Sequence, residues 1–477
     1  PLCKNYGVPA STDRQKLGRP TLSNKRKKDT YIISGDNVKK KMICSFCNEY
    51  PSIKSNKGIS EEVDRLSYYL LDKPEPCCPN LHCDNHTIGI TSNKKSYQLF
   101  GRTRSGSPRY RCKSCSKTFS IKRSTTGQKK PHLNKLIFKL LVGKVPFRKI
   151  SDIAEISQGT LYPKIDFIYK QCLAFVSNRE KNLSQEKIDR LYISVDRQEY
   201  VVNWTKRKDK RNIKLTAVGS ADNNTMYVFG MHLNYDSSLN SELIEDDAIK
   251  CGDYEVSNSY RKYARAWLAQ DYDEAVARSS KGGKGLVNAE LTDIITNTYK
   301  EALLRQDIEV SEDLPYTAAL PKRGMQIHAE YTLYAHFFFL MRQFNGVEKV
   351  RFFLDQDSGM RAACLTAFQE RVSNRTCDAF YVRLTKDMTV DEKRREVKEA
   401  EKLFKKFQKT YPRLSFEDIK ILMIKDELHR MTAIGKWKDR WLLHPFPNMS
   451  EPEKAVCYLT DFNDYTPEHT TLKGLLK

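Results

Sequence analysis

Two closely spaced cysteine pairs constrain this chain more than any other feature of its sequence. Cys78 and Cys83 form a C-x4-C pair, and Cys112 and Cys115 form a C-x2-C pair. Two such pairs, a few tens of residues apart, fit the tetrahedral coordination of zinc, with two ligands from each of two turns. Four unrelated buried thiols are the alternative, but paired spacing of this kind is rare by accident. The sequence therefore predicts a zinc ribbon over residues 77–125.

The segment between the two pairs is basic and also rich in glycine and serine. That composition predicts a hairpin tip that suits a phosphate backbone better than a protein core. The side chains that we expect to contact DNA there are Arg102, Arg104, Arg109 and Arg111.

A weaker copy of the motif lies at the start of the chain. The stretch Met42-Ile-Cys44-Ser-Phe-Cys47 matches Tyr110-Arg-Cys112-Lys-Ser-Cys115, which indicates an internal repeat of two ribbons. The first ribbon would cover residues 1–59, with a helical linker over 60–76. The counterpart of Cys78 would fall before the first residue, so the fourth ligand is missing or replaced, with Cys77 as one substitute. The predicted ligands of the first ribbon are Cys3, Cys44 and Cys47.

The charge of the whole chain indicates a polyanionic partner. Its 477 residues carry a formal net charge of +23, which favours nucleic acid over an anionic membrane surface. No apolar run approaches the ~20 residues that span a bilayer. Most of the 13 cysteines are paired near the N-terminus and the others are scattered, which favours metal ligation and reduced thiols over a disulfide framework. We expect a cytoplasmic protein.

Residues 130–180 have the pattern of a helix-turn-helix. A recognition helix there would direct polar side chains into the major groove. Glu155 stands at the turn position usually held by glycine, and Pro163 would cost a helix interior one hydrogen bond. A plain helical hairpin is the alternative. The residues that we expect to contact DNA are Arg148, Gln158, Thr160 and Lys164.

Much of the second half of the chain has the hydrophobic pattern of β-strands. Segments 188–235 and 325–410 predict an α/β core of the ribonuclease-H type with a mixed sheet, interrupted by a mostly helical insertion at 236–324. Residues 411–477 read as a C-terminal helical region. The fold class is therefore multidomain, combining α+β and α/β parts.

Two aspartates end apolar strands at matched positions of this core. Asp196 closes the first strand and Asp355 closes the fourth, so both carboxylates would lie on adjacent central strands. Paired carboxylates of this kind hold Mg²⁺ ions for phosphoryl transfer. Asp357 competes with Asp355, and an aspartate after a strand can also be a simple turn former. A basic run one strand away would admit a phosphate backbone through Lys206, Arg207, Lys210 and Arg211.

A third catalytic acid is ambiguous in the sequence. Glu451 is the preferred candidate, beside Glu453 in a predicted capping box that begins at Ser450. Glu392 fits the simplest topology, but it also completes a capping box with Thr389. The acid could also lie beyond Lys477.

These parts together resemble a known family. The ribbon residues Tyr110–Ser120, the segment Arg148–Lys164, and Asp196 with Asp355 are similar to those of bacterial insertion-sequence transposases of the IS1 group. In that family a zinc ribbon and a helix-turn-helix precede a DDE catalytic domain. The resemblance implies recognition of element ends, Mg²⁺-dependent strand cleavage and strand transfer, and a homodimer or larger assembly that synapses two ends. It covers most of the chain apart from the insertion and the tail.

Two other functions are compatible with the same residues. A catalytically retired DNA-binding regulator or scaffold would keep the N-terminal modules and be indifferent to Asp196→Ala. A nuclease in defence or repair would share the chemistry of the carboxylates and lack the joining step.

Overall fold

The fold is known from a computed structural model, which describes most of the chain in two compact units. It describes residues 53–71, 75–121, 124–203, 211–279, 319–385, 387–430 and 439–460, with isolated positions between 291 and 297. For 31–34, 41–44, 276–279, 358 and 432–434 it describes the backbone alone. Unit 1 comprises Pro1–Leu66 and Leu183–Lys477, and unit 2 comprises Ser67–Asn182. Among the described residues, no helix is long and apolar enough to cross a bilayer.

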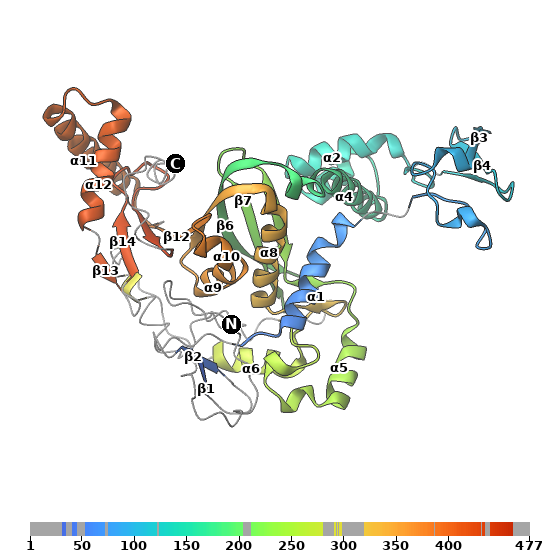
Figure 1. Ribbon diagram of the computed structural model, residues 1–477, viewed down its shortest axis with the longest axis horizontal. Helices are drawn as coiled ribbons and strands as arrows, with labels where there is room; N and C mark the ends of the chain where they lie inside the picture. The colour runs from blue at the N-terminus through green and yellow to red at the C-terminus, as the bar shows by residue number, and fades with distance from the viewer. Residues whose placement is uncertain are drawn as a thin grey trace. The chain divides into compact units, whose positions relative to one another are not determined.

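Unit 1 is built on a mixed sheet of eight strands (Figure 1), which confirms the predicted mixed α/β class. The order is β13-β14-β15-β12-β11-β6-β7-β8. β7 is antiparallel to β6 and β8 to β7, whereas β11 is parallel to β6 and β12 is parallel to β11. The strands are β6 (Ile188–Val202), β7 (Ile213–Asp222), β8 (Val228–Leu233), β11 (Val347–Asp355), β12 (Cys377–Leu384), β13 (Thr432–Ile434), β14 (Asp439–Leu443) and β15 (Lys454–Tyr458).

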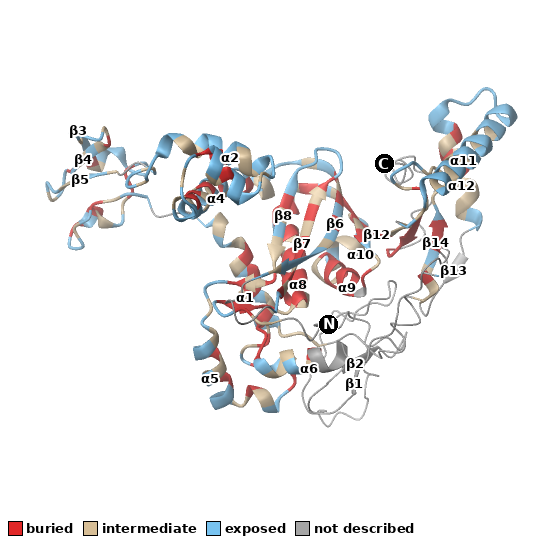
Figure 2. Ribbon diagram, turned by 180° about the vertical axis from the view of Figure 1, so that it is seen from behind, coloured by how far each residue is buried: buried red, intermediate tan, exposed pale blue. Residues whose placement is uncertain are grey.

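Helices cover both faces of this sheet. α8 (Ala329–Gln343) and α9 (Ser358–Ala367) lie on one face, where the Phe352 ring is 5.6 Å from that of Phe337. Figure 2 shows both helices largely buried. Because side chains alternate along a strand, the next residue, Phe353, points to the other face and stacks on Phe380. That face is covered by α12 (Phe416–Arg430), through Ile421 and Ile424.

The N-terminal part of unit 1 is anchored to α8. α1 (Asn56–Ser67) packs Val63 and Leu66 against Ala335, so the expected helical linker is in part a core element. Glu62 has no exposed side-chain surface and accepts hydrogen bonds from Arg65, Arg265 and Thr332. The expected helical insertion contains α5 (Ser241–Cys251) and α6 (Ala269–Ser279).

The C-terminal region differs from the helical expectation. Residues after 410 supply α12, but also β13, β14 and β15, which extend the sheet beyond β12. The predicted capping box from Ser450 to Glu453 is wrong, because no helix follows and β15 begins at Lys454. Asn448 Oδ1 accepts the backbone N–H groups of Ser450 and Glu451 instead, which forms a turn into the strand.

Unit 2 contains a small sheet followed by three helices. The sheet has the order β3-β4-β5, with β3 (Tyr97–Arg102), β4 (Pro108–Cys112) and β5 (Thr118–Ser120) all antiparallel. The helices are α2 (Asn134–Val142), α3 (Phe147–Ile153) and α4 (Gln158–Glu180), which share a core around Ile137, Ile150 and Leu161.

A strand pairing recurs at the two cysteine motifs. In unit 2, Tyr97 lies opposite Cys112, the last residue of β4. In unit 1, β1 (Tyr31–Ser34) pairs with β2 (Lys41–Cys44) and places Tyr31 opposite Cys44. The same register at both sites supports the internal repeat expected from the sequence.

Candidate metal centre and candidate nucleic-acid interface

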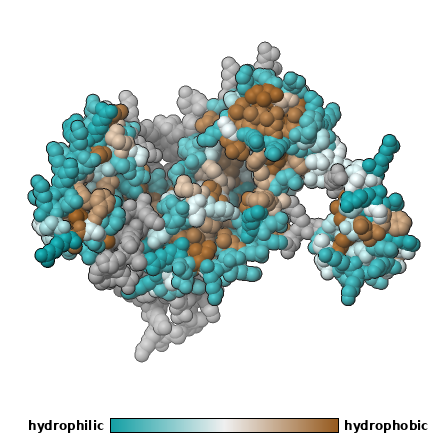
Figure 3. Space-filling model, turned by 90° about the horizontal axis from the view of Figure 1, so that it is seen from above, coloured by the Kyte–Doolittle hydropathy of each residue, from teal (hydrophilic) through white to brown (hydrophobic). Residues whose placement is uncertain are grey.

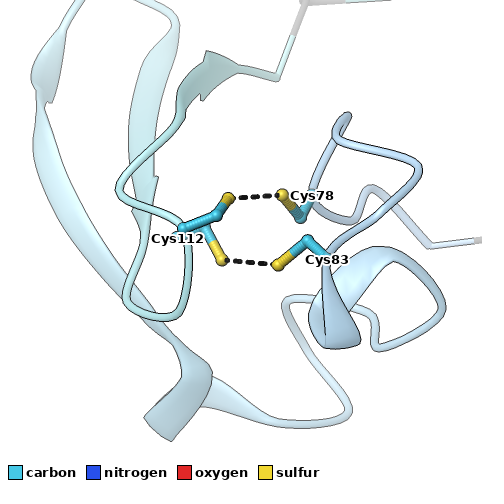
Figure 4. Close-up of side chains that lie close together, drawn as sticks. Cys78, Cys83 and Cys112 are labelled. Carbon is cyan, nitrogen blue, oxygen red and sulfur yellow. Dashed lines mark hydrogen bonds between the residues drawn. The ribbon is translucent and has the colours of Figure 1, made fainter.

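Four cysteines of unit 2 converge on one point (Figure 4). Their Sγ atoms all lie within 4.8 Å of one another, with 3.4 Å between Cys78 and Cys115 and 3.7 Å between Cys83 and Cys112. Four thiolates around zinc, each bound at ~2.3 Å in a tetrahedron, would lie about 3.8 Å apart. The predicted association of the two pairs is confirmed, and the donor set can hold a metal such as zinc.

The hydrogen bonds around Cys112 and Cys115 favour the ionised form that a metal requires. Burial opposes ionisation of Cys112, but N–H groups of Cys115, Asn85 and Ser114 lower its pKa to about 6. Asn85 Nδ2 lies 3.3 Å from Cys112 Sγ. Backbone N–H donation from Lys117 lowers the pKa of Cys115. In contrast, burial raises the pKa of Cys78 to about 12, which a bound metal ion would reverse.

Local backbone geometry explains how the C-x2-C pair can face one metal. Ser116, directly after Cys115, has φ 57°, in the left-handed region. This conformation reverses the chain so that the N–H groups of the turn point back at the sulfurs. Tyr97 supports the opposite pair, because its hydroxyl accepts the N–H of Cys78 at 3.0 Å and donates to carbonyl oxygens of Asn85 and Ile88.

The arginines between the two pairs lie on an exposed hairpin. Arg109 and Arg111 on β4 each hold the guanidinium 5.8 Å from the centre of the exposed Phe100 ring. Arg102 donates to the Gly106 carbonyl across the turn, and Arg104 lies at the turn itself. All four side chains are exposed, so the hairpin presents a basic, solvent-facing surface.

The predicted helix-turn-helix corresponds to α3, a short turn and α4. Glu155 in the turn has φ 49°, the left-handed conformation that glycine usually supplies. Ser157 occupies the N-cap position, although its side chain contacts the Thr160 hydroxyl and makes no capping bond to the backbone. α4 continues through Pro163. The geometry of two helices joined by a tight turn is therefore present.

One predicted DNA contact in this region is wrong. Lys164 is only 3% exposed, and its Nζ donates to the Lys130 carbonyl at 2.9 Å and to Asn134 Oδ1 at 2.8 Å. These contacts tie α4 to the start of α2, and burial lowers the pKa of Lys164. Arg148 and Gln158 are exposed, and Thr160 is half-buried.

Apolar side chains also gather on the surface of these helices (Figure 3). α4 is apolar on more than one side, and aromatic residues along it are more than half exposed. A large exposed apolar area on a basic protein is typical of an interface with another protein. The exposed residues are Leu136, Phe138, Val142, Tyr162, Tyr169 and Phe175.

The two predicted catalytic aspartates lie side by side in unit 1. β6 and β11 run parallel with Val195 opposite Leu354, so the next residues, Asp196 and Asp355, are neighbours on the same face. Both side chains are exposed, and each accepts a hydrogen bond from the backbone N–H that follows it. On the neighbouring strand β7, Gly219 lies opposite Asp196. Because glycine has no side chain, the face of the sheet beside Asp196 stays open.

Asp357, the predicted competitor of Asp355, has a different position. It is 7% exposed and caps α9, because its Oδ1 accepts the N–H groups of Gly359 and Met360. Its Oδ2 lies 3.1 Å from Arg197 Nη1. Arg197 directly follows Asp196 in the chain, and the ion pair therefore ties the strand of Asp196 to the loop of Asp355.

No third carboxylate joins this pair in the described part of the chain. Glu451 lies in the turn before β15 and pairs with Lys454 at 3.2 Å. Glu453 accepts the Thr385 hydroxyl at 2.9 Å, just beyond the end of β12. Glu392 completes the predicted capping box with Thr389, which is confirmed.

Sequence reasoning overlooked Glu396, on α11 (Val390–Thr410). Burial, Glu453 and Glu399 raise its pKa, so two carboxylates lie near each other beyond the end of β12. The signal that could have found it is helical spacing, because Glu396 follows Glu392 by one turn and is partly buried.

Several predicted residues fall outside the described residues. These are Cys3, Cys47, Lys206, Arg207 and Lys210, while for Cys44 only the backbone is described. Arg211 is described, exposed, and lies 3.4 Å from the Tyr272 hydroxyl.

Comparison of the chain with protein-family models, with curated proteins and with solved structures finds no match.

Proposed function

We propose that this protein is a DNA transposase that binds element ends and performs Mg²⁺-dependent strand cleavage and strand transfer. The strand order supports a ribonuclease-H-like core. Its first strand, β6, is central, the antiparallel β7 and β8 lie on one side of it, and the parallel β11 and β12 lie on the other. α8 precedes β11 and α9 precedes β12, as the connections of parallel strands require.

The observation that carries the proposal is the adjacency of Asp196 and Asp355. Carboxylate oxygens suit Mg²⁺, and these two are exposed on one face of the sheet. Bound there, Mg²⁺ would activate a water or 3′-hydroxyl and stabilise the leaving oxygen of a phosphodiester. Asp196 and Asp355 would be its ligands, and the open surface at Gly219 would leave room for a phosphate group.

Unit 2 would recognise the DNA ends. Its zinc ribbon would hold the basic hairpin of β3 and β4 in shape, and its helix-turn-helix would present Arg148 and Gln158. A second copy of the chain is expected because two ends must be brought together, and the exposed apolar residues of α2 and α4 offer a surface for it. The bacterial nucleoid is the expected location.

The test is cleavage by the full chain. We would incubate it with DNA duplexes that span the flanks of its own gene, with and without Mg²⁺, and resolve nicks on denaturing gels. Asp196→Asn should lower cleavage about 1000-fold, which corresponds to ~4 kcal/mol in the barrier, because a metal ligand is lost at the reacting phosphate. Asp189→Asn is the matched control, since Asp189 is exposed on the same strand outside the site.

The outcomes separate the candidate functions. Equal activity of the two variants would contradict the assignment of Asp196. Binding without cleavage by the unaltered protein would favour the regulator or scaffold, and cleavage without joining would favour the nuclease.

A further inference from the structure

The helix α11 has an apolar inner side and a long outer face that is exposed to solvent. Its inner side carries Val397, Ala400, Phe404 and Phe407, and the Phe404 ring lies 4.8 Å from that of Phe416 on α12. No residue of α11 is fully buried, and Figure 2 shows the helix exposed along most of its length. The hairpin of α11 and α12 thus leaves one long helical face in solvent.

That outer face is predominantly basic, although Asp391 and Glu399 also lie on it. At 100° per residue, the positions opposite the Phe404 side fall on one stripe. We call this stripe the α11 ridge; it consists of Arg395, Lys398, Lys402, Lys405, Lys406 and Lys409, all exposed.

The lysines of the α11 ridge have no ionic partner among the described residues. The ion pair of α11 is made by Arg394 with Asp391, near the edge of the stripe. On α12, in contrast, Lys420 pairs with Glu417 and Arg430 pairs with Asp426. Like charges at helical spacing destabilise a helix by about 0.2–0.5 kcal/mol per pair. Glu399 and Glu401 lie at helical spacing from Lys402 and Lys405 and offset part of this repulsion, and a bound polyanion would relieve the rest.

The α11 ridge starts close to the edge of the sheet that carries the paired aspartates. In the parallel register Asp355 lies opposite Val382, and β12 ends two residues later at Leu384. α11 begins at Val390, and its Glu396 lies near Glu453, which is bonded to Thr385 at the end of β12.

We propose that the α11 ridge binds the phosphate backbone of duplex DNA whose reacting strand lies at Asp196 and Asp355. From Lys398 to Lys409 the helix rises about 17 Å. A duplex strand has one phosphate per ~3.4 Å, so about five phosphates of one strand match the five lysines. The inference rests on the proposed function, because it places the reacting strand at Asp196 and Asp355, but its test needs only DNA binding and no metal chemistry.

The test is the salt dependence of DNA binding by the full chain. Fluorescence anisotropy with a labelled duplex would be measured from 0.05 to 0.3 M salt, without Mg²⁺ and without a chelator that would strip the cysteine site. The slope of log K against log salt is negative, and each lost phosphate contact reduces its magnitude by ~0.9. K398Q/K402Q should therefore reduce the magnitude of the slope by about 1.8 and weaken binding about 60-fold at 0.1 M salt.

Two matched variants define the controls. K420Q/R430Q makes the same change in charge on α12, where both cations are ion-paired, and should leave the slope nearly unchanged. K398R/K402R keeps the charge and should bind as the unaltered chain does. Circular dichroism would show that all three retain their helices, which is expected because glutamine and arginine are good helix formers.

The outcomes distinguish this inference from the proposed function. If the unaltered chain does not bind duplex DNA, DNA binding itself fails. If it binds and K398Q/K402Q keeps the same slope, the α11 ridge is overturned while the transposase proposal stands. Binding to phosphatidylserine vesicles would be measured as well. If K398Q/K402Q loses binding to these vesicles but not to DNA, the assignment of the α11 ridge to DNA is also overturned.

Discussion

The ion pair between Arg197 and Asp357 makes a quantitative prediction about the sheet unit. Asp357 contributes in two ways, since one carboxylate oxygen caps α9 and the other lies 3.1 Å from Arg197 Nη1. The Arg197 side chain is 28% exposed and the Asp357 side chain is 9% exposed. Three substitutions separate the two contributions: Asp357→Asn keeps a capping oxygen and loses the charge, Asp357→Ala loses both, and Arg197→Met removes only the cation.

The magnitudes follow from burial and geometry. Exposed ion pairs contribute ~0.2–1 kcal/mol, whereas breaking a buried pair costs ~3–5 kcal/mol. Because Arg197 is partly exposed, we expect a coupling of about 1–2 kcal/mol. Loss of an N-cap adds about 1 kcal/mol. Asp357→Asn and Arg197→Met should thus each lower the free energy of unfolding by about 1–2 kcal/mol, and Asp357→Ala by about 2–3 kcal/mol.

Tryptophan fluorescence is the appropriate assay, because it reports on one unit. All four tryptophans lie outside residues 67–182. A double-mutant cycle with Arg197→Met and Asp357→Asn, followed by urea titration, gives the coupling directly. A coupling below ~0.3 kcal/mol would show that the pair does not hold the two segments together. Equal values for Asp357→Asn and Asp357→Ala would refute the capping role.

Two further predictions concern the cysteine site and a buried histidine pair. Asn85→Ala should weaken zinc binding about 10–100-fold in a competition with a chromogenic chelator, because Asn85 donates to Cys112 Sγ, whereas Asn93→Ala, in a local turn, should not. His336 Nδ1 lies 2.9 Å from His232 Nδ1, and burial lowers both pKa values, that of His232 to about 3. Because the folded pKa lies below the unfolded value, the stability contributed by the neutral pair is complete above pH ~6.5 and is lost as the pH falls below it. Between pH 7.5 and pH 5 the depressed pKa of His232 alone should lower the free energy of unfolding by about 2 kcal/mol, and His336 should add to the fall in the same direction. His336→Gln should reduce this dependence, and an unchanged pH profile would contradict the role of the pair.

Local features of the sequence predicted local features of the structure. The spacing of the four cysteines was sufficient to predict that they meet, and the Thr389–Glu392 pattern correctly predicted a capping box. The capping box depends on residues three apart in the chain, and the cysteine cluster depends on four side chains that bind the same kind of metal. The adjacency of Asp196 and Asp355 followed from strand order, because parallel strands that end together bring their last residues together.

Other features depend on contacts that a single sequence does not display. Lys164 has the polarity of a groove-facing residue, but carbonyl and amide oxygens at the start of α2 satisfy its charge inside the unit. The S-x-x-E pattern at Ser450 also fits a turn, and pairing of β15 with the distant β12 decides in favour of a strand. The first cysteine set and most of the basic run after β6 stay predictions.

The order of the two units along the chain has a mechanical consequence. Unit 2 is an insertion within unit 1, so it is joined to it by two chain segments, after Leu66 and before Leu183. A domain attached by one flexible tether presents its ligand at millimolar effective concentration and can rotate freely about that tether. Two attachment points remove much of this rotational freedom. Any ligand that unit 2 binds would therefore be offered to unit 1 over a narrower range of orientations than a singly tethered domain allows.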